Sequence, residues 1–263
     1  MAAGIYAGID IGSLSSEALL LGQDGVLAYS IMSTGANPRR AAGKCLEDAL
    51  AKAVLDEKAI SAVVATGYGR IRVPFADREV TEITCHARGA HFLFPRTRTV
   101  IDIGGQDSKV ITLDGQGRVS DFVMNDKCAA GTGRFLEVMA AALETELTDM
   151  GRRSLYAKRG VSISSMCTVF AESEVISLIA EGYGEGEIIR GLHEAICRRI
   201  FGMTKRLRVR EEITLSGGVA KNQAIAETLK ALFGIRINVP EEPQIVGALG
   251  AALYARDMEF KEG

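Results

Sequence analysis

The chain has 263 residues, of which 47% are hydrophobic and 24% charged, values that are ordinary for a globular protein. This length allows one large core or two modest ones. The formal net charge of −2 gives no reason to expect nucleic acid as the main partner. No apolar run is long enough to cross a bilayer. We therefore expect neither a membrane nor a nucleic acid among the partners.

The cysteines and the N-terminal residues indicate the cellular compartment in which the protein is expected to work. The five cysteines are an odd number without tight disulfide spacing. Met1-Ala-Ala-Gly-Ile-Tyr6 lacks a basic segment and leads directly into an apolar run, so no export signal is expected. These features predict a reducing cytoplasm, with some cysteines bound to metal or simply buried.

The first informative pattern is a repeat of Asp-Ile-Gly at the ends of two apolar runs. Asp10-Ile-Gly12 is followed by a turn of small residues, an apolar run, the turn pair Asp24-Gly25 and a second apolar run. Asp102-Ile-Gly104 is followed by the same series, with Asp114-Gly115 as the turn pair. The simplest account is a duplicated strand–turn–strand–turn–strand unit.

Helices and further strands follow each copy. Asn37-Pro38 predicts the N-cap and first residue of a helix over about 38–57. A long helix over 186–207 has an apolar stripe and a basic opposite face, which is usually solvated but could dock an acidic electron donor. The other expected strands are at 62–66, 161–164 and 213–216. The other expected helices are at 81–93, from the end of the loop 125–133 to about 147, at about 168–181, from near 222 onward, and at 247–254.

A strand that ends in Asp and continues into a glycine-rich turn suits a nucleotide. Backbone N–H groups in such a turn can point at phosphate oxygens, and the acidic side chain can hold Mg²⁺ through water. The turn Ser216-Gly-Gly-Val219, between a strand and a helix, suits close contact with an adenosine group. One copy alone would be an ordinary hairpin, but two matched copies and this third motif favour ATP.

Three segments resemble those of the two-domain ATPases that include actin, hexokinase and heat-shock-protein ATPases. Asp10–Ser16 is similar to their first phosphate loop, Asp102–Lys109 to the second, and Leu215–Ala220 to their adenosine motif. The resemblance implies an α/β fold of two ribonuclease H-like lobes with a nucleotide cleft between them. We place lobe I at residues 1–95 and lobe II at 96–244, with a C-terminal helix at 245–263 that packs back on lobe I.

These motifs and this resemblance give the predicted nucleotide site. Asp10, Asp102 and Gln106 are the predicted catalytic residues, and Gln106 and Asp107 lie where hydrolytic water or Mg²⁺ could be positioned. The residues expected to bind ATP, ADP or Mg²⁺ are Gly12, Ser13, Leu14, Ser15, Ser16, Glu17, Gly104, Gly105, Asp107, Lys109, Gly131, Gly133, Gly217, Gly218, Val219, Asn222 and Gln244.

Cys128 and Cys167 each come just before a predicted helix, among small or polar residues. A thiolate at a helix N-terminus is stabilised by unpaired N–H groups and by the helix dipole. An iron–sulfur cubane needs four thiolates, so a symmetric dimer would supply them to one cluster on its two-fold axis. Zinc could bind the same four sulfurs, and two buried thiols are the plainer alternative. Cys45, Cys85 and Cys197 are predicted to be buried small hydrophobic residues.

The segments around these two cysteines resemble one family closely. Met124–Phe135 and Ser164–Glu174 are similar to the cluster motifs of the 2-hydroxyacyl-CoA dehydratase activators, which are related to the ATPase subunits of benzoyl-CoA reductase. The resemblance covers the chain from about residue 5 to about 255. Further similar segments are Ala65–Arg70, Ile101–Asp107, Ser216–Ala220 and Gly247–Tyr254.

This resemblance implies a homodimer with one 4Fe–4S cluster, bound by Cys128 and Cys167 of both subunits, and one ATP per subunit. It implies an ATP-hydrolysing activator that takes an electron from ferredoxin or flavodoxin and passes it to a partner iron–sulfur enzyme, a 2-hydroxyacyl-CoA dehydratase. The acceptor could instead be a benzoyl-CoA reductase-like enzyme or a double-cubane protein. Outside this class, the alternatives are a small-molecule kinase of the same fold without a cluster and a zinc-stabilised ATP sensor.

The chain departs from the activator pattern at the end of the first phosphate loop. Activators usually have Lys there, and this chain has Glu17. A carboxylate at this position removes a positive contact to phosphate and adds repulsion. Lys109 or an arginine elsewhere would then have to compensate.

Overall fold

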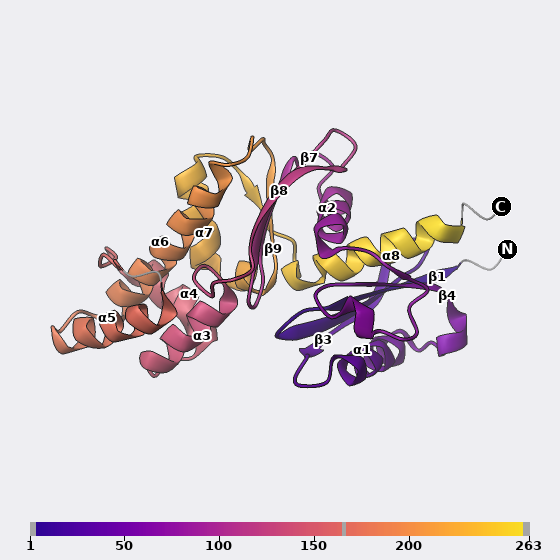
Figure 1. Cartoon of the computed structure of the whole chain (residues 1–263), viewed down its shortest axis with the longest axis horizontal. Helices are drawn as coiled ribbons and strands as arrows, with labels where there is room; N and C mark the ends of the chain where they lie inside the picture. Colours follow the sequence, from indigo (N-terminus) through magenta and orange to yellow (C-terminus); the bar gives the residue numbers. More distant parts are fainter. Residues whose placement is uncertain (1–3, 165–166, 260–263) are drawn as a thin grey trace. The chain divides into compact units, whose positions relative to one another are not determined.

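The computed structural model describes residues 4–164 and 167–259. The chain divides into two compact units. The first unit comprises Met1–Thr97, Leu113–Ser120 and Glu241–Gly263, and the second comprises Arg98–Thr112 and Asp121–Pro240. Each unit is built around a five-stranded sheet with helices (Figure 1).

The sheet of the first unit has the strand order β3-β2-β1-β4-β5. Its first three strands are antiparallel neighbours, whereas β4 and β5 run parallel to β1. Alternate residues of β1 enter two separate cores, one under α1 (Pro38–Ala53) and one under α2 (Glu82–Leu93) and α8 (Val246–Glu259). Burial on both faces explains why this strand reads as a continuous apolar run. The strands are β1 (Ile5–Ile11), β2 (Ser15–Leu21), β3 (Val26–Ser33), β4 (Ile60–Thr66) and β5 (Arg78–Glu79).

The small residues of the C-terminal helix allow close backbone packing, as the sequence predicts. A Cβ atom on Gly8 of β1 would overlap the carbonyl oxygen of Ala248, and one on Gly250 would overlap that of Cys85. Helix α8 therefore lies directly against β1 and α2 (Figure 1). The helices of this unit are α1 (Pro38–Ala53), α2 (Glu82–Leu93) and α8 (Val246–Glu259), with short 3-10 helices η1 (Glu57–Ala59), η2 (Arg70–Arg72) and η4 (Pro243–Ile245).

The second sheet repeats the first. Its order is β10-β9-β6-β7-β8, so β6, β7 and β8 correspond to β1, β2 and β3, and β9 is parallel to β6 as β4 is to β1. The duplicated unit expected from the sequence is therefore present. The strands are β6 (Thr99–Ile103), β7 (Ser108–Leu113), β8 (Val119–Asn125), β9 (Ile213–Ser216) and β10 (Ile237–Asn238).

One large core fills the second unit beneath its helices. Buried side chains of α6, including Ile188, Leu192, Ile196 and Ile200, form the stripe that the sequence predicts. The helices are α3 (Gly133–Ala142), α4 (Leu147–Tyr156), α5 (Thr168–Ala180), α6 (Glu185–Thr204), the 3-10 helix η3 (Gly218–Lys221) and α7 (Gln223–Phe233).

Three expected elements differ from the structure. The helix predicted over 38–57 ends at Ala53, because Val54 adopts a left-handed φ of 56° that closes the last turn. The helix predicted to reach about 147 ends at Ala142, because Glu144 has a φ of 51°, and a separate helix, α4, begins at Leu147. Residues 161–164, predicted as a strand, belong to no strand. Among the described residues, no helix is long and apolar enough to span a membrane.

Candidate functional site

The turn of the first hairpin is tightly closed. The Gly12 amide donates to the Ser15 carbonyl oxygen at 2.9 Å, and a Cβ on Gly12 would lie 2.8 Å from that oxygen. Ser16 is buried and shares a hydrogen bond with Thr34 at 2.7 Å, so its hydroxyl is used inside the unit. Residues 12–15 remain partly exposed. Gln244 reaches this turn, since its side-chain amide donates to the Ser15 hydroxyl at 3.3 Å.

Asp10 lies at the end of β1 in a buried acidic setting. It is opposite Glu17 in the antiparallel register, and the two residues are only 7% and 4% exposed. The Nε2 atom of His86 is 3.9 Å from the Asp10 carboxylate. Gly67 and Gly247 leave room for that carboxylate, because a Cβ atom on either would overlap its oxygens. His86, Gly67 and Gly247 are not among the predicted site residues, although Gly67 and Gly247 lie in two of the segments that resemble the activators.

Asp102 has the opposite electrostatic setting in the second hairpin. Its antiparallel partner is Lys109, whose Nζ is 3.1 Å from Asp102 and 2.9 Å from Asp107. Ser216, its partner on the parallel side, donates a hydrogen bond to Asp102 at 3.0 Å. Asp102, Lys109 and Ser216 are all at least 96% buried. This carboxylate is therefore neutralised within its own unit.

The turn of the second hairpin is joined to the start of α3. Gly104 donates to the Asp107 carbonyl oxygen at 3.0 Å, which closes the turn. The Gly133 amide in turn donates to the Gly104 carbonyl oxygen at 2.9 Å, and the Arg134 amide donates to that of Gly105 at 2.8 Å. The first N–H groups of α3 therefore hold this turn in place.

The turn after β9 approaches the same hairpin. Gly217 has a φ of 86°, and a Cβ on it would lie 2.8 Å from a carboxylate oxygen of Asp102. Gly218 is exposed, whereas Val219 is buried in the core. Asn222 caps α7 by accepting the Ala224 amide at 3.1 Å, and its side-chain amide lies 3.0 Å from the Nε2 atom of His193. The predicted residues thus gather in two groups, one in each unit.

The two predicted metal ligands differ from the other cysteines in exposure. Cys167 is exposed and occupies the N-cap position of α5, and Cys128 is partly exposed in the loop between β8 and α3. Cys128 does not cap α3, because Thr132 precedes that helix directly. Residues 165 and 166 lie outside the described residues.

Cys45, Cys85 and Cys197 are buried, as the sequence predicts. Burial raises the pKa of Cys45 to about 11 and that of Cys85 to about 12, and it raises the pKa of Cys197 further. These three thiols are therefore unsuited to bind metal as thiolates. Within the described residues of one chain, no three His, Cys, Asp or Glu side chains form a metal-binding group. The four ligands of a cubane are accordingly not assembled by these residues alone.

The Cys128 loop is held by Asn125. The Asn125 amide donates to the carbonyl oxygens of Cys128 and Ala130 at 2.8 and 3.0 Å. Gly131 then turns the chain with a φ of 86°, which is a left-handed conformation that favours glycine. The loop therefore has a fixed backbone path, while the Cys128 residue itself keeps partial exposure.

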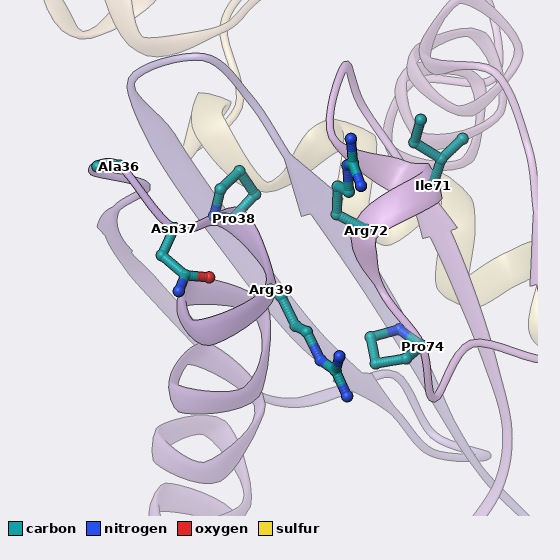
Figure 2. Close-up of a pocket in the computed structure, with 7 residues that line it drawn as sticks. All are labelled: Ala36, Asn37, Pro38, Arg39, Ile71, Arg72 and Pro74. Atoms are coloured by element: carbon teal, nitrogen blue, oxygen red, sulfur yellow. The ribbon is translucent and has the colours of Figure 1, made fainter.

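A separate pocket of about 350 Å³ lies in the first unit. Arg39 at the start of α1 and Arg72 in η2 line it, together with Ala36, Asn37, Pro38, Ile71 and Pro74 (Figure 2). None of these residues is buried, and none belongs to the predicted nucleotide or metal sites. The pocket is therefore distinct from the hairpin turn of its unit.

Comparison with known proteins identifies the class to which these features belong. The duplicated sheets and hairpins are those of the two-lobe actin-like ATPases; a putative N-acetylglucosamine kinase from Chromobacterium violaceum shares this fold at 16% identity, with a TM-score of 0.56 over 94% of this chain and 98% of that chain. The chain belongs to the BadF/BadG/BcrA/BcrD ATPase family, whose model matches residues 7–255. It is thus a member of an ATPase family, as the sequence predicts.

A similarity to dehydratase activators extends over nearly the whole chain, in sequence and in structure. A 2-hydroxyisocaproyl-CoA dehydratase activator from Clostridioides difficile is 46% identical over 257 residues, which are 97% of this chain and 96% of that protein. The solved structure of the activator of the 2-hydroxyisocaproyl-CoA dehydratase from Clostridium difficile with bound ADPNP has a TM-score of 0.93 at 43% identity, and the match covers 99% of this chain and 96% of that one. The resemblance to dehydratase activators is confirmed.

Proposed function

We propose that this protein is an ATP-dependent activator that transfers single electrons from ferredoxin or flavodoxin to a partner iron–sulfur enzyme, a 2-hydroxyacyl-CoA dehydratase. The proposal assigns ATP or ADP with Mg²⁺ to the hairpin turns at residues 12–17 and 104–109 and to the turn at 216–219. It assigns one 4Fe–4S cluster to Cys128 and Cys167 of two identical chains. When bound, such a cluster supplies a one-electron redox centre.

The observation that carries the proposal is the division among the cysteines. The three buried thiols have pKa values raised by burial, whereas the two cysteines in the activator-like segments are exposed or partly exposed. Cys167 also occupies the N-cap of a 13-residue helix, where unpaired N–H groups favour a thiolate or an anionic cluster. The donor set therefore fits a cluster that is shared between two chains.

The surface of α5 supports the homodimer. Val169 and Phe170 are each 67% exposed, and Ile176 and Ile179 are 57% and 46% exposed on the same helix. Large apolar side chains gathered on one helix usually mark a surface that another protein covers. The helix begins at the exposed cysteine, so a second copy that covers α5 would also approach Cys167.

The decisive experiment is anaerobic purification followed by iron and sulfide analysis, absorbance and electron paramagnetic resonance. We expect brown dimers with one cluster, which Cys128→Ser and Cys167→Ser each abolish. The matched control is Cys197→Ala, which removes a buried thiol and is expected to keep the cluster. Colourless protein without iron after reconstitution would refute the proposal, and zinc in the same site would favour the ATP-sensor alternative.

The electron acceptor is identified by a second measurement. The reduced protein, ATP and a candidate acceptor are mixed, and acceptor reduction is followed against ATP hydrolysis. We expect a 2-hydroxyacyl-CoA dehydratase to be reduced only when ATP is present. Reduction of a benzoyl-CoA reductase-like enzyme or a double-cubane protein instead would replace the dehydratase in the proposal. Phosphorylation of a small molecule by protein without a cluster would favour the kinase alternative.

A further inference from the structure

Helix α6, which is labelled in Figure 1, makes hydrogen bonds or close contacts to Val161, to Asn222 and to the Cys128 loop of the second unit. Its first two turns lie against Val161. The Val161 amide donates to the Glu187 carbonyl oxygen at 3.1 Å, and a Cβ on Gly191 would overlap the Val161 carbonyl oxygen. Val161 is thus packed against Gly191 of α6 without space for even a methyl group.

The middle of α6 is bonded to the turn at 216–222. His193 is fully buried, and its Nε2 atom lies 3.0 Å from the side-chain amide nitrogen of Asn222. The side-chain oxygen of Asn222 accepts the Ala224 amide, which fixes the side chain so that its NH₂ group donates to His193. Burial lowers the pKa of His193 to about 4, so the ring is neutral near pH 7. Because the Asn222 NH₂ group is the donor, Nε2 is the acceptor and the ring proton lies on Nδ1.

The last turns of α6 hold the Cys128 loop. The Nη2 atom of Arg199 donates to the side-chain oxygen of Asn125 at 3.3 Å, and Asn125 in turn bonds the carbonyl oxygens of Cys128 and Ala130. The aliphatic part of Arg199 also lies against Gly131, where a Cβ would be 3.3 Å from the Arg199 Cδ atom. Sequence reasoning placed Arg199 on a solvated basic face, but the structure turns it toward this loop.

We propose that α6 couples nucleotide occupancy at the turn 216–222 to the Cys128 loop, with His193 and Arg199 as its positioning residues. The inference rests on the proposed function, because it needs both a nucleotide and a cluster. His193 and Arg199 are six residues apart, or about 9 Å along one helix. A continuous, buried helix moves as one body because packed interiors leave little slack between neighbours. A displacement at Asn222 therefore reaches Asn125 through α6.

The test measures how nucleotide changes access to the cluster. Anaerobic dimers are mixed with an iron chelator, and iron release is timed with and without ADPNP. Binding of ADPNP to cluster-loaded and cluster-free protein is measured separately, because coupling between two sites must act equally in both directions. For the unmodified protein we expect ADPNP to change the release rate, and we expect the ADPNP affinities of the cluster-loaded and cluster-free proteins to differ about fivefold or more, which is the lower end of typical site-to-site coupling.

The variants distinguish a loss of coupling through α6 from a general loss of folding or binding. His193→Phe removes the acceptor for Asn222, and Arg199→Gln removes the charged donor to Asn125. Both are expected to bind ADPNP and carry the cluster, yet to lose the effect of nucleotide on iron release. Arg198→Gln is the matched control, because Arg198 is exposed and pairs with Glu194 at 3.5 Å. It should behave as the unmodified protein does.

Further variants keep the inference open to refutation. Arg199→Lys retains a cationic donor and should restore part of the nucleotide effect. If Arg199→Gln does not fold, Asn125→Asp breaks the same link by removing the donor to the Cys128 loop. An unchanged nucleotide effect in His193→Phe and in the Arg199 or Asn125 variant would overturn the inference. Absence of a cluster from the unmodified protein would instead refute the proposed function.

Discussion

The two hairpins share one topology but place their central carboxylates in opposite settings. Asp10 faces Glu17 across the first hairpin, and Asp102 faces Lys109 at the equivalent position of the second. All four residues are buried. The first hairpin therefore concentrates negative charge beside His86, whereas the second forms an ion pair.

The residues that pair with the two aspartates on the parallel strands differ as well, and again the second aspartate has the stronger hydrogen-bond partner. Thr66 pairs with Asp10 in register, as Ser216 pairs with Asp102. The Ser216 hydroxyl donates to its aspartate, but the buried Thr66 hydroxyl has no nitrogen or oxygen partner among the described residues and lies near the weakly polar Cys85 thiol. Duplication has thus preserved the backbone and changed the chemistry. Equivalent positions in the two units should not be assigned equal roles from topology alone.

The largest effect is expected from breaking the second hairpin's ion pair. Lys109→Met leaves Asp102 buried without its 3.1 Å partner, and breaking a buried pair in this way costs about 3–5 kcal/mol. Urea unfolding measures the loss. Lys52→Met is the control, because Lys52 is 53% exposed and its bond to Asp48 should contribute less than about 1 kcal/mol. Equal losses in the two variants would show that Lys109 does not stabilise the fold through Asp102.

The sequence predicts the duplication well because its signals are local. Each copy carries an aspartate, a glycine turn and a second turn pair, and these residues determine the hairpins wherever they occur. Aligning the two copies also pairs Glu17 with Lys109, so the charge reversal can be read from the repeat. What the sequence does not give is the ion pairing of Lys109 with Asp102 and Asp107. The nucleotide contact expected of Lys109 stays a prediction.

Contacts between residues far apart in the sequence explain most of the features that the sequence does not predict. Asn125 and Arg199 meet from different elements, and no periodicity in either segment predicts their hydrogen bond. One signal existed: Arg199 lies three residues after buried Ile196, at the edge of the apolar stripe rather than opposite it. The break at Glu144 has no such signal, since nothing in that apolar segment requires a positive φ.

The next effect in size comes from the two hydroxyl groups beside the aspartates. Ser216→Ala removes a buried hydrogen bond to a charged group and should cost about 1.5–3 kcal/mol. Thr66→Val removes a hydroxyl that makes no hydrogen bond to nitrogen or oxygen in the described residues, and it should be close to neutral. Thermal or urea unfolding of the pair tests the contrast. A loss for Thr66→Val as large as that for Ser216→Ala would mean that the two hairpins do not differ here.

A smaller gain is expected when the first hairpin is given the charge pattern of the second. Glu17→Lys replaces a like-charged cross-strand pair with an opposite pair, which should raise the free energy of unfolding by about 1–2 kcal/mol. Glu17→Gln removes the negative charge without adding a positive one and should give a smaller change. Binding of ADPNP should strengthen in Glu17→Lys if this position faces phosphate. A destabilised Glu17→Lys protein would show that the acidic pair is itself a favourable arrangement.

The smallest effect concerns the pH dependence of stability, through the buried Cys45 thiol whose pKa the charge of Glu17 influences. Burial raises the pKa of Cys45 from 9.0 to about 11, and the negative charge of Glu17 adds to that shift. Because the folded pKa lies above the unfolded one, this contribution to stability is complete below pH 9 and is lost as the pH rises toward 11. Between pH 9 and 10 the protein should lose roughly 1 kcal/mol that Cys45→Ala does not lose. Glu17→Lys should also reduce this loss, because the introduced ammonium group would favour the thiolate in the folded state. If the free energy of unfolding falls equally with rising pH in the unmodified protein, Cys45→Ala and Glu17→Lys, then neither the Cys45 thiol nor its interaction with Glu17 contributes. The difference between the hairpins would then be limited to their carboxylates.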